Sequence, residues 1–72
     1  MIIHIKMADQ FSAKDVKETL ERTANYVVQR VDRAADGFWH VVTQVPDTTP
    51  LREFGSSVRN KFGEFFRGIL VQ

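Results

Sequence analysis

Apolar residues in the middle of the chain recur every three or four positions, the spacing that one face of an α-helix requires. From Leu20 to Val45 the steps alternate between four and three, as in a heptad seam. Polar side chains fall mainly on the opposite side, and Ser12 followed by Asp15 resembles a capping box at the start. The pattern predicts a long amphipathic helix over residues 12–45, with a stripe of Val16, Leu20, Ala24, Val27, Val31, Ala34, Phe38, Val41 and Val45.

Two prolines, Pro46 and Pro50, interrupt this periodicity. Neither fits a helix interior, because proline lacks the backbone N–H donor and its ring clashes with the preceding turn. Thr49 followed by Pro50 suits the cap and the first position of a new helix. The sequence therefore predicts a turn over 46–50 and a second helix over 51–71.

The second predicted helix carries an unusually large aromatic load on one face. Arg59 and Lys61 lie near the two borders of that face, where their methylene stems can cover apolar surface. Basic borders beside an apolar face are typical of helices that lie in a membrane interface. The face consists of Leu51, Phe54, Val58, Phe62, Phe65 and Ile69, widened by Phe66 and Leu70.

The string Ser57-Val58-Arg59-Asn60-Lys61-Phe62-Gly63-Glu64-Phe65-Phe66 is similar to the lipid-surface helices of small exchangeable apolipoproteins. The resemblance covers this string alone and implies a type of surface, namely one that contacts lipid. The long helix predicted before it lacks the same distribution of charge.

Together these segments predict an all-α fold, with the two amphipathic helices in a helical hairpin that self-associates or docks on a partner. Residues 1–10 are expected to be an extended or flexible N-terminal segment of the same single domain. An alternative remains open. Asp36-Gly37 could end the helix, and the aromatic and β-branched residues 38–45 could form a strand beside residues 2–7, giving a small βαβα unit.

Composition narrows the classes of function. With 72 residues the chain forms one small domain that buries only about 60% of its unfolded surface. It has no cysteine, and ten basic against nine acidic residues give little reason to expect nucleic acid as a partner. No stretch is long and apolar enough to span a bilayer or to form a secretory signal. We expect an intracellular location, with membrane association as the alternative.

Candidate chemistry is sparse. On a continuous helix Asp32, Asp36 and His40 would lie along one face at a spacing that could hold a divalent ion, but a solvated polar face is the simpler interpretation. The hydroxyls of Ser56 and Ser57 have no histidine nearby in the sequence. We predict no catalytic residue, no metal ligand, no cofactor and no small-molecule substrate.

The predicted function is therefore that of a non-enzymatic interaction subunit that binds a protein partner or a second copy of itself. The runner-up is a peripheral protein that binds an anionic membrane surface, and a small α/β regulatory or nucleic-acid-binding protein has the lowest weight. The partner-binding residues of the long helix are expected to be Leu20, Val27, Val31, Phe38, Trp39, Val41 and Val45. The lipid- or partner-binding residues of the second helix are expected to be Phe54, Val58, Phe62, Phe65, Phe66, Ile69, Leu70, Arg59 and Lys61.

Overall fold

The N-terminal residues form a strand at the centre of an antiparallel sheet, in the computed structural model that describes residues 1–72. Ile3, Ile5 and Met7 point into the core while the residues between them face the other side, the period-two pattern of a strand. The elements in chain order are β1 (Ile2–Met7), α1 (Gln10–Thr19), β2 (Val28–Arg33), β3 (Trp39–Gln44), α2 (Leu51–Phe62) and β4 (Phe66–Val71).

The sheet has the strand order β2-β3-β1-β4, and every neighbouring pair is antiparallel. Strands β1 and β2 are therefore parallel to each other with β3 inserted between them, and β3 and β4 enclose β1 in the same way. Two interlocked βαβ units of this kind make the split βαβ, or ferredoxin-like, topology.

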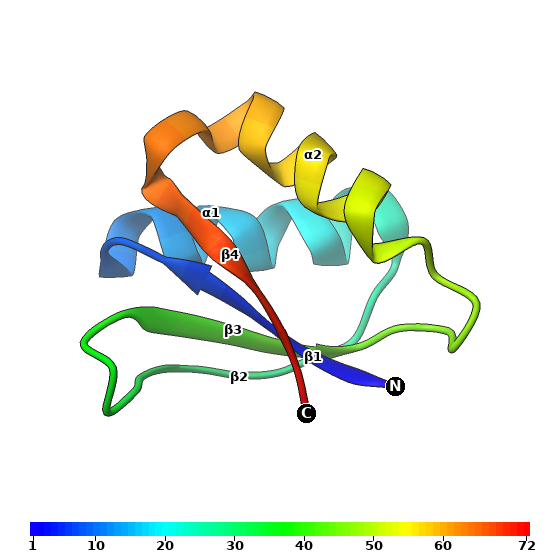
Figure 1. The fold of residues 1–72 in the computed structure, drawn as a ribbon, viewed down its shortest axis with the longest axis horizontal. Coiled ribbons are helices and arrows are strands. Elements are labelled where there is room, and N and C mark those ends of the chain that lie inside the picture. Colours follow the sequence, from blue (N-terminus) through cyan, green and yellow to red (C-terminus); the bar gives the residue numbers. More distant parts are fainter.

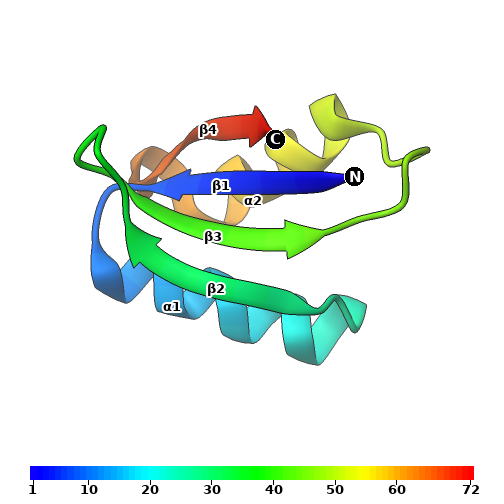
Figure 2. The same cartoon turned by 90° about the horizontal axis from the view of Figure 1, so that it is seen from below.

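Both helices pack on one face of the sheet, and the other face carries no helix (Figures 1 and 2). The core lies between the two layers and is built from Ile3, Ile5, Met7, Ala13, Val16, Leu20, Val41, Val45, Val58 and Phe66. The all-α expectation is wrong, because the chain is a four-stranded sheet with two helices, and the helical hairpin does not form.

The long predicted helix ends within its first third. α1 continues as a π-helical turn over Leu20–Ala24 and stops at Asn25, whose φ of 56° lies in the left-handed region that asparagine tolerates. The heptad interpretation failed because positions four apart also share one face of a strand. In β2 a register shift between Val28 and Arg30 also places two residues three apart, Val28 and Val31, against the core, so the segment fitted a helical spacing although it pairs with β3 as a strand.

A hairpin turn replaces the predicted helix between β2 and β3. The Asp36 carboxylate accepts a hydrogen bond from Phe38 N–H at 2.9 Å, and Gly37 has a φ of 87° that a helix interior does not allow. The strand alternative was correct for this region, since β1 and β3 pair from Ile2 with Gln44 to Met7 with Trp39.

The second predicted helix is correct over Leu51–Phe62 and wrong beyond it. Gly63, with φ 61° and ψ −133°, ends α2, and a 3₁₀ turn over Gly63–Phe65 leads into β4. Phe66 and Ile69, expected on a helix face, lie on a strand that packs beneath α2.

The first helix begins two residues before the expected start, and the second begins at the expected residue but without the cap expected from Thr49. Asp9, and not Ser12, caps α1: its carboxylate accepts a hydrogen bond from Ser12 N–H at 2.8 Å. That bond is the main reason why the pKa of Asp9 lies below its ordinary value. α2 begins at Leu51 after Pro50, without a side-chain cap. Neither helix has the length and apolar character needed to cross a membrane.

Candidate functional site

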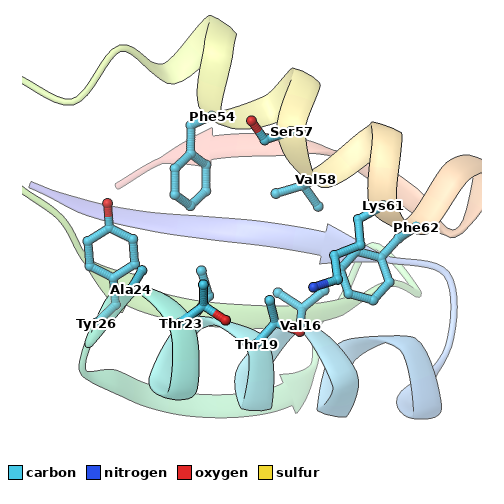
Figure 3. A pocket seen from close by; sticks show the side chains of 11 residues that line it. Val16, Thr19, Thr23, Ala24, Tyr26, Phe54, Ser57, Val58, Lys61 and Phe62 are labelled. Carbon is cyan, nitrogen blue, oxygen red and sulfur yellow. The ribbon is translucent and has the colours of Figure 1, made fainter.

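A groove of about 280 Å³ runs between α1 and α2, on the outer side of the helical layer. Its floor is apolar, formed by Val16, Leu20 and Val58. Aromatic rings close its ends: Tyr26 and Phe54 lie with ring centroids 6.0 Å apart at one end, and Phe62 lies toward the other (Figure 3).

Helix periodicity explains why these side chains converge. Phe54, Val58 and Phe62 are four residues apart on α2 and lie along one face. On the facing segment, Val16, Thr19, Leu20 and Thr23 follow the three-and-four spacing that aligns one face of a helix, and the stripe continues into the π-helical turn. The sheet beneath holds the two stripes apart, so that they line a groove instead of interlocking.

The apolar surface continues beyond the groove into a second, shallower hollow. Lys61 and Phe62 line both hollows and connect them. The second hollow adds two phenylalanines that are open to solvent, Phe11 with 81% and Phe65 with 47% of its surface exposed. Exposed phenylalanines next to an apolar groove are unusual on a domain that has no partner on that side.

The polar rim of this surface carries both charges. The ammonium group of Lys61 and the carboxylate of Asp15 both line the second hollow, and neither belongs to one of the four ion pairs of the chain. The hydroxyls of Thr19, Thr23 and Ser57 line the groove itself, with no histidine or carboxylate among the lining residues. The groove therefore offers apolar contact, hydrogen-bonding hydroxyls and the amine of Lys61.

The structure separates the residues that the long-helix seam had joined. Leu20 lies on the floor of the groove, whereas Val41 and Val45 are fully buried beneath the helices. Val31 and Trp39 are partly buried against the core and line a small hollow beside α1. Val27 is 72% exposed beyond the end of the π-helical turn. Phe38 lies in the β2–β3 turn, with the Lys6 ammonium 5.7 Å from its ring centre.

The expected residues of the second helix are divided among three places. Phe54, Val58, Lys61 and Phe62 line the groove, and Phe65 lies in the adjoining hollow. Phe66 and Ile69 pack into the core region, and the Arg59 guanidinium lies 5.3 Å from the ring centre of Phe66. Leu70 is half exposed on the helix-free face, opposite His4 of β1.

A second cluster of polar side chains lies on the helix-free face of the sheet. The Nδ1 atoms of His4 and His40 are 2.9 Å apart. His40 Nε2 lies 2.8 Å from the Asp36 carboxylate, and His4 Nε2 lies 2.8 Å from the side-chain oxygen of Gln72. The pKa of Asp36 lies below its ordinary value, first because the carboxylate accepts the Phe38 N–H bond and then because it pairs with His40.

Asp32, Asp36 and His40 do not lie along one helix face as considered from the sequence; the sheet brings them together instead, with Asp32 of β2 paired in register with His40 of β3. Asp36 and His40 do pair, but across the β2–β3 turn, while Asp32 pairs with Arg30 at 3.0 Å. No group of three or more histidine, cysteine or acidic side chains converges as a metal site anywhere in the chain.

Sequence reasoning missed two features of these surfaces. The predicted helix over 12–45 left Phe11 outside it and without a role. His4 and His40 are 36 positions apart in the sequence, and the helical interpretation gave no reason for them to meet. A signal for the histidine pair was present, because the alternative strand pairing of residues 2–7 with 38–45 brings both onto one sheet.

Comparison with protein-family models, with curated proteins and with solved structures finds no match to this chain. The fold defines a small two-layer α/β protein of split βαβ topology, with an apolar groove over the helices and a histidine pair on the helix-free face.

Proposed function

We propose that this chain is a non-enzymatic binding module that docks an amphipathic helix of a partner protein in the groove between α1 and α2. The observation that carries the proposal is the continuity of the groove with the exposed rings of Phe11 and Phe65. A small ligand enclosed in the groove would leave both rings in water, whereas a partner helix lying along it would cover them.

The dimensions of the groove support a helical partner. The wall from Phe54 to Phe62 spans eight residues of helix, about 12 Å at 1.5 Å per residue. A partner helix presents anchors at i, i+3 or i+4, and i+7 over about 10 Å, which matches this wall.

The rim indicates the charges that the partner brings. A carboxylate on the partner helix can pair with Lys61, and a basic residue can pair with Asp15 on the opposite wall. Pairs at the rim contribute more to orientation and specificity than to affinity. Asp15 and the capping residue Asp9 both line the second hollow beside Phe11 and Phe65. Their negative charges disfavour an anionic membrane as the occupant.

The lipid-surface alternative loses its original basis. It required residues 51–71 to form one helix, and α2 ends at Phe62. The helix-free sheet face gives no reason to propose a nucleic acid partner either, because Lys6 and Arg30 on that face are accompanied by Asp32 and Asp36.

The test is selection of helical peptides on the full chain. A displayed library of amphipathic helices, randomised at the anchor positions, should yield peptides whose binding shifts the amide NMR signals of residues lining the groove. Phe11→Asp should weaken binding of the selected peptides at least tenfold, and Lys61→Glu should change which peptide charges are selected; neither residue is in the buried core.

Leu70→Asp is the matched control, since it places the same charge on a half-exposed apolar residue of the opposite face. The affinity of this variant for the selected peptides should stay within twofold of that of the parent chain. Peptides that map to the sheet face, or a library without binders, would count against the proposal. Binding to anionic vesicles that Lys61→Glu abolishes would favour the lipid surface instead.

A further inference from the structure

The histidine pair on the helix-free face brings two imidazole nitrogens into direct contact. The two ring centroids are 5.1 Å apart and the two Nδ1 atoms 2.9 Å, so each ring directs its Nδ1 toward the other. The ring planes are nearly perpendicular, at 84°. The rings come from adjacent strands, His4 from β1 and His40 from β3.

The outer nitrogens determine where the ring protons lie. The Asp36 carboxylate and the Gln72 side-chain oxygen are acceptors, so the Nε2 atoms of His40 and His4 each carry the proton and donate it. In two neutral rings both Nδ1 atoms are then unprotonated, and two lone pairs face each other at 2.9 Å. In this arrangement the contact is repulsive, and it is relieved by a proton or metal ion between the nitrogens, or by a turn of the Gln72 amide that leaves His4 Nδ1–H to donate to His40.

We propose that His4 and His40 form a two-imidazole site for a divalent first-row transition-metal ion, with Zn²⁺ as the ion to test. Neutral imidazole is a preferred ligand of zinc and its neighbours in the series. Metal-binding histidines usually donate their other N–H to a carboxylate or a carbonyl oxygen, which fixes the tautomer and the ring orientation. Asp36 and Gln72 occupy those two positions here.

The change needed to admit the ion is small. Zinc–nitrogen bonds of about 2.0–2.1 Å at a tetrahedral angle place the two nitrogens about 3.3 Å apart. The rings therefore have to turn until the nitrogens separate by a few tenths of an ångström. Where a proton bridges the two nitrogens, the metal displaces it, and one proton is released for each ion bound.

The side chains around the histidine pair determine the local charge and the route by which an ion reaches it. Lys6 of β1 pairs in register with His40, and Arg30 and Asp32 of β2 lie on the same face, so the nearby side chains of Lys6, Arg30, Asp32 and Asp36 sum to no net charge. His40 is 5% exposed, and the ion enters on the side of His4, which is partly exposed. With no third protein ligand, water fills the remaining coordination positions.

This site lies on the face opposite the groove, so its test is independent of the proposed docking function. Zinc should raise the thermal midpoint of the full chain and bind in calorimetry, whereas magnesium, which prefers oxygen ligands, should do neither. His4→Gln should abolish the zinc effect, and its partial exposure makes it the variant least damaging to folding.

Two carboxylate variants distinguish the effect of ring orientation on zinc binding from the effect of a lost negative charge nearby. Asp36→Asn should weaken zinc binding about 10- to 100-fold, the usual effect of losing the outer partner of a metal-binding histidine. Asp32→Asn removes the same charge from the position that pairs in register with His40, but the Asp32 carboxylate hydrogen-bonds Arg30 and not a histidine, so its effect should be under threefold. Zinc binding that survives His4→Gln, or no zinc binding by the parent chain, overturns the assignment.

Discussion

At the scale of single residues, burial and not hydrophobicity alone decides how much a side chain contributes to the stability of the fold. Ile5 and Val27 are both aliphatic and β-branched, yet Ile5 is completely buried in β1 and Val27 is 72% exposed. The helical seam gave Val27 a central place among the expected contact residues. The strand geometry reverses this assignment, because the segment after Asn25 leaves the helical layer before it pairs with β3.

Truncation at these two positions should therefore have opposite outcomes. Ile5→Ala should lower the free energy of unfolding by about 2–5 kcal/mol, because it removes buried methyl groups and leaves a cavity. Val27→Ala should change it by less than about 0.5 kcal/mol. Urea titrations followed by circular dichroism measure both values. A large loss of unfolding free energy for Val27→Ala would instead support the continuous helical face predicted over 12–45.

At the scale of the elements, glycines set the boundaries that hydrophobic periodicity did not reveal. Gly63 ends α2 with a φ of 61° and ψ of −133°, a region that residues with a Cβ avoid. Gly55, in the middle of the same helix, has ordinary helical geometry, and a Cβ there would lie 3.5 Å from Ile69 and 3.7 Å from Phe66, in normal van der Waals contact. The helix predicted over 51–71 contained both glycines in its interior.

Alanine substitution distinguishes the two glycines. Gly63→Ala should cost about 1–3 kcal/mol of unfolding free energy, because alanine is strained in that conformation. Gly55→Ala should gain about 0.4–1 kcal/mol, because it restricts the unfolded chain and fits the folded one. Thermal and urea unfolding of the two variants give the comparison. If residues 51–71 formed one helix, both substitutions would stabilise the protein.

At the scale of the whole molecule, acid should weaken the fold in part through the cap of α1. The pKa of Asp9 is lower in the folded chain than the ordinary value of 3.8, mainly because of the hydrogen bond from Ser12 N–H. A lowered pKa means that the stabilisation is fully present above the unfolded value. It is lost as the pH falls below 3.8 and through the folded pKa.

Asp9→Asn should flatten this part of the pH dependence, because asparagine still caps the helix but does not titrate. The measurement is the urea midpoint of the parent chain and of the variant between pH 5 and pH 2. Asp15→Asn, which removes an exposed carboxylate of α1 that makes no cap bond, is the control. If the urea midpoints of the parent chain and of Asp9→Asn fall equally steeply with pH, the cap does not contribute to acid unfolding.

Local sequence signals predicted α2 from Leu51 to Phe62 with its apolar face, the break at Pro46–Pro50, and the alternative pairing of residues 2–7 with 38–45. These features depend on periodicity, proline and turn residues, which act over a few positions. The sequence by itself did not separate helix from strand after Asn25, because spacings of four suit both structures.

Tertiary structure decided the rest. Pairing β1 with both β3 and β4 satisfies the backbone hydrogen bonds of residues 66–71 as a strand, and it turns Phe66 and Ile69 under α2. The same pairing brings His4 beside His40 and leaves Phe11 in water at the end of the groove. Contacts between residues far apart in the chain create both surfaces, and no local pattern could have revealed them.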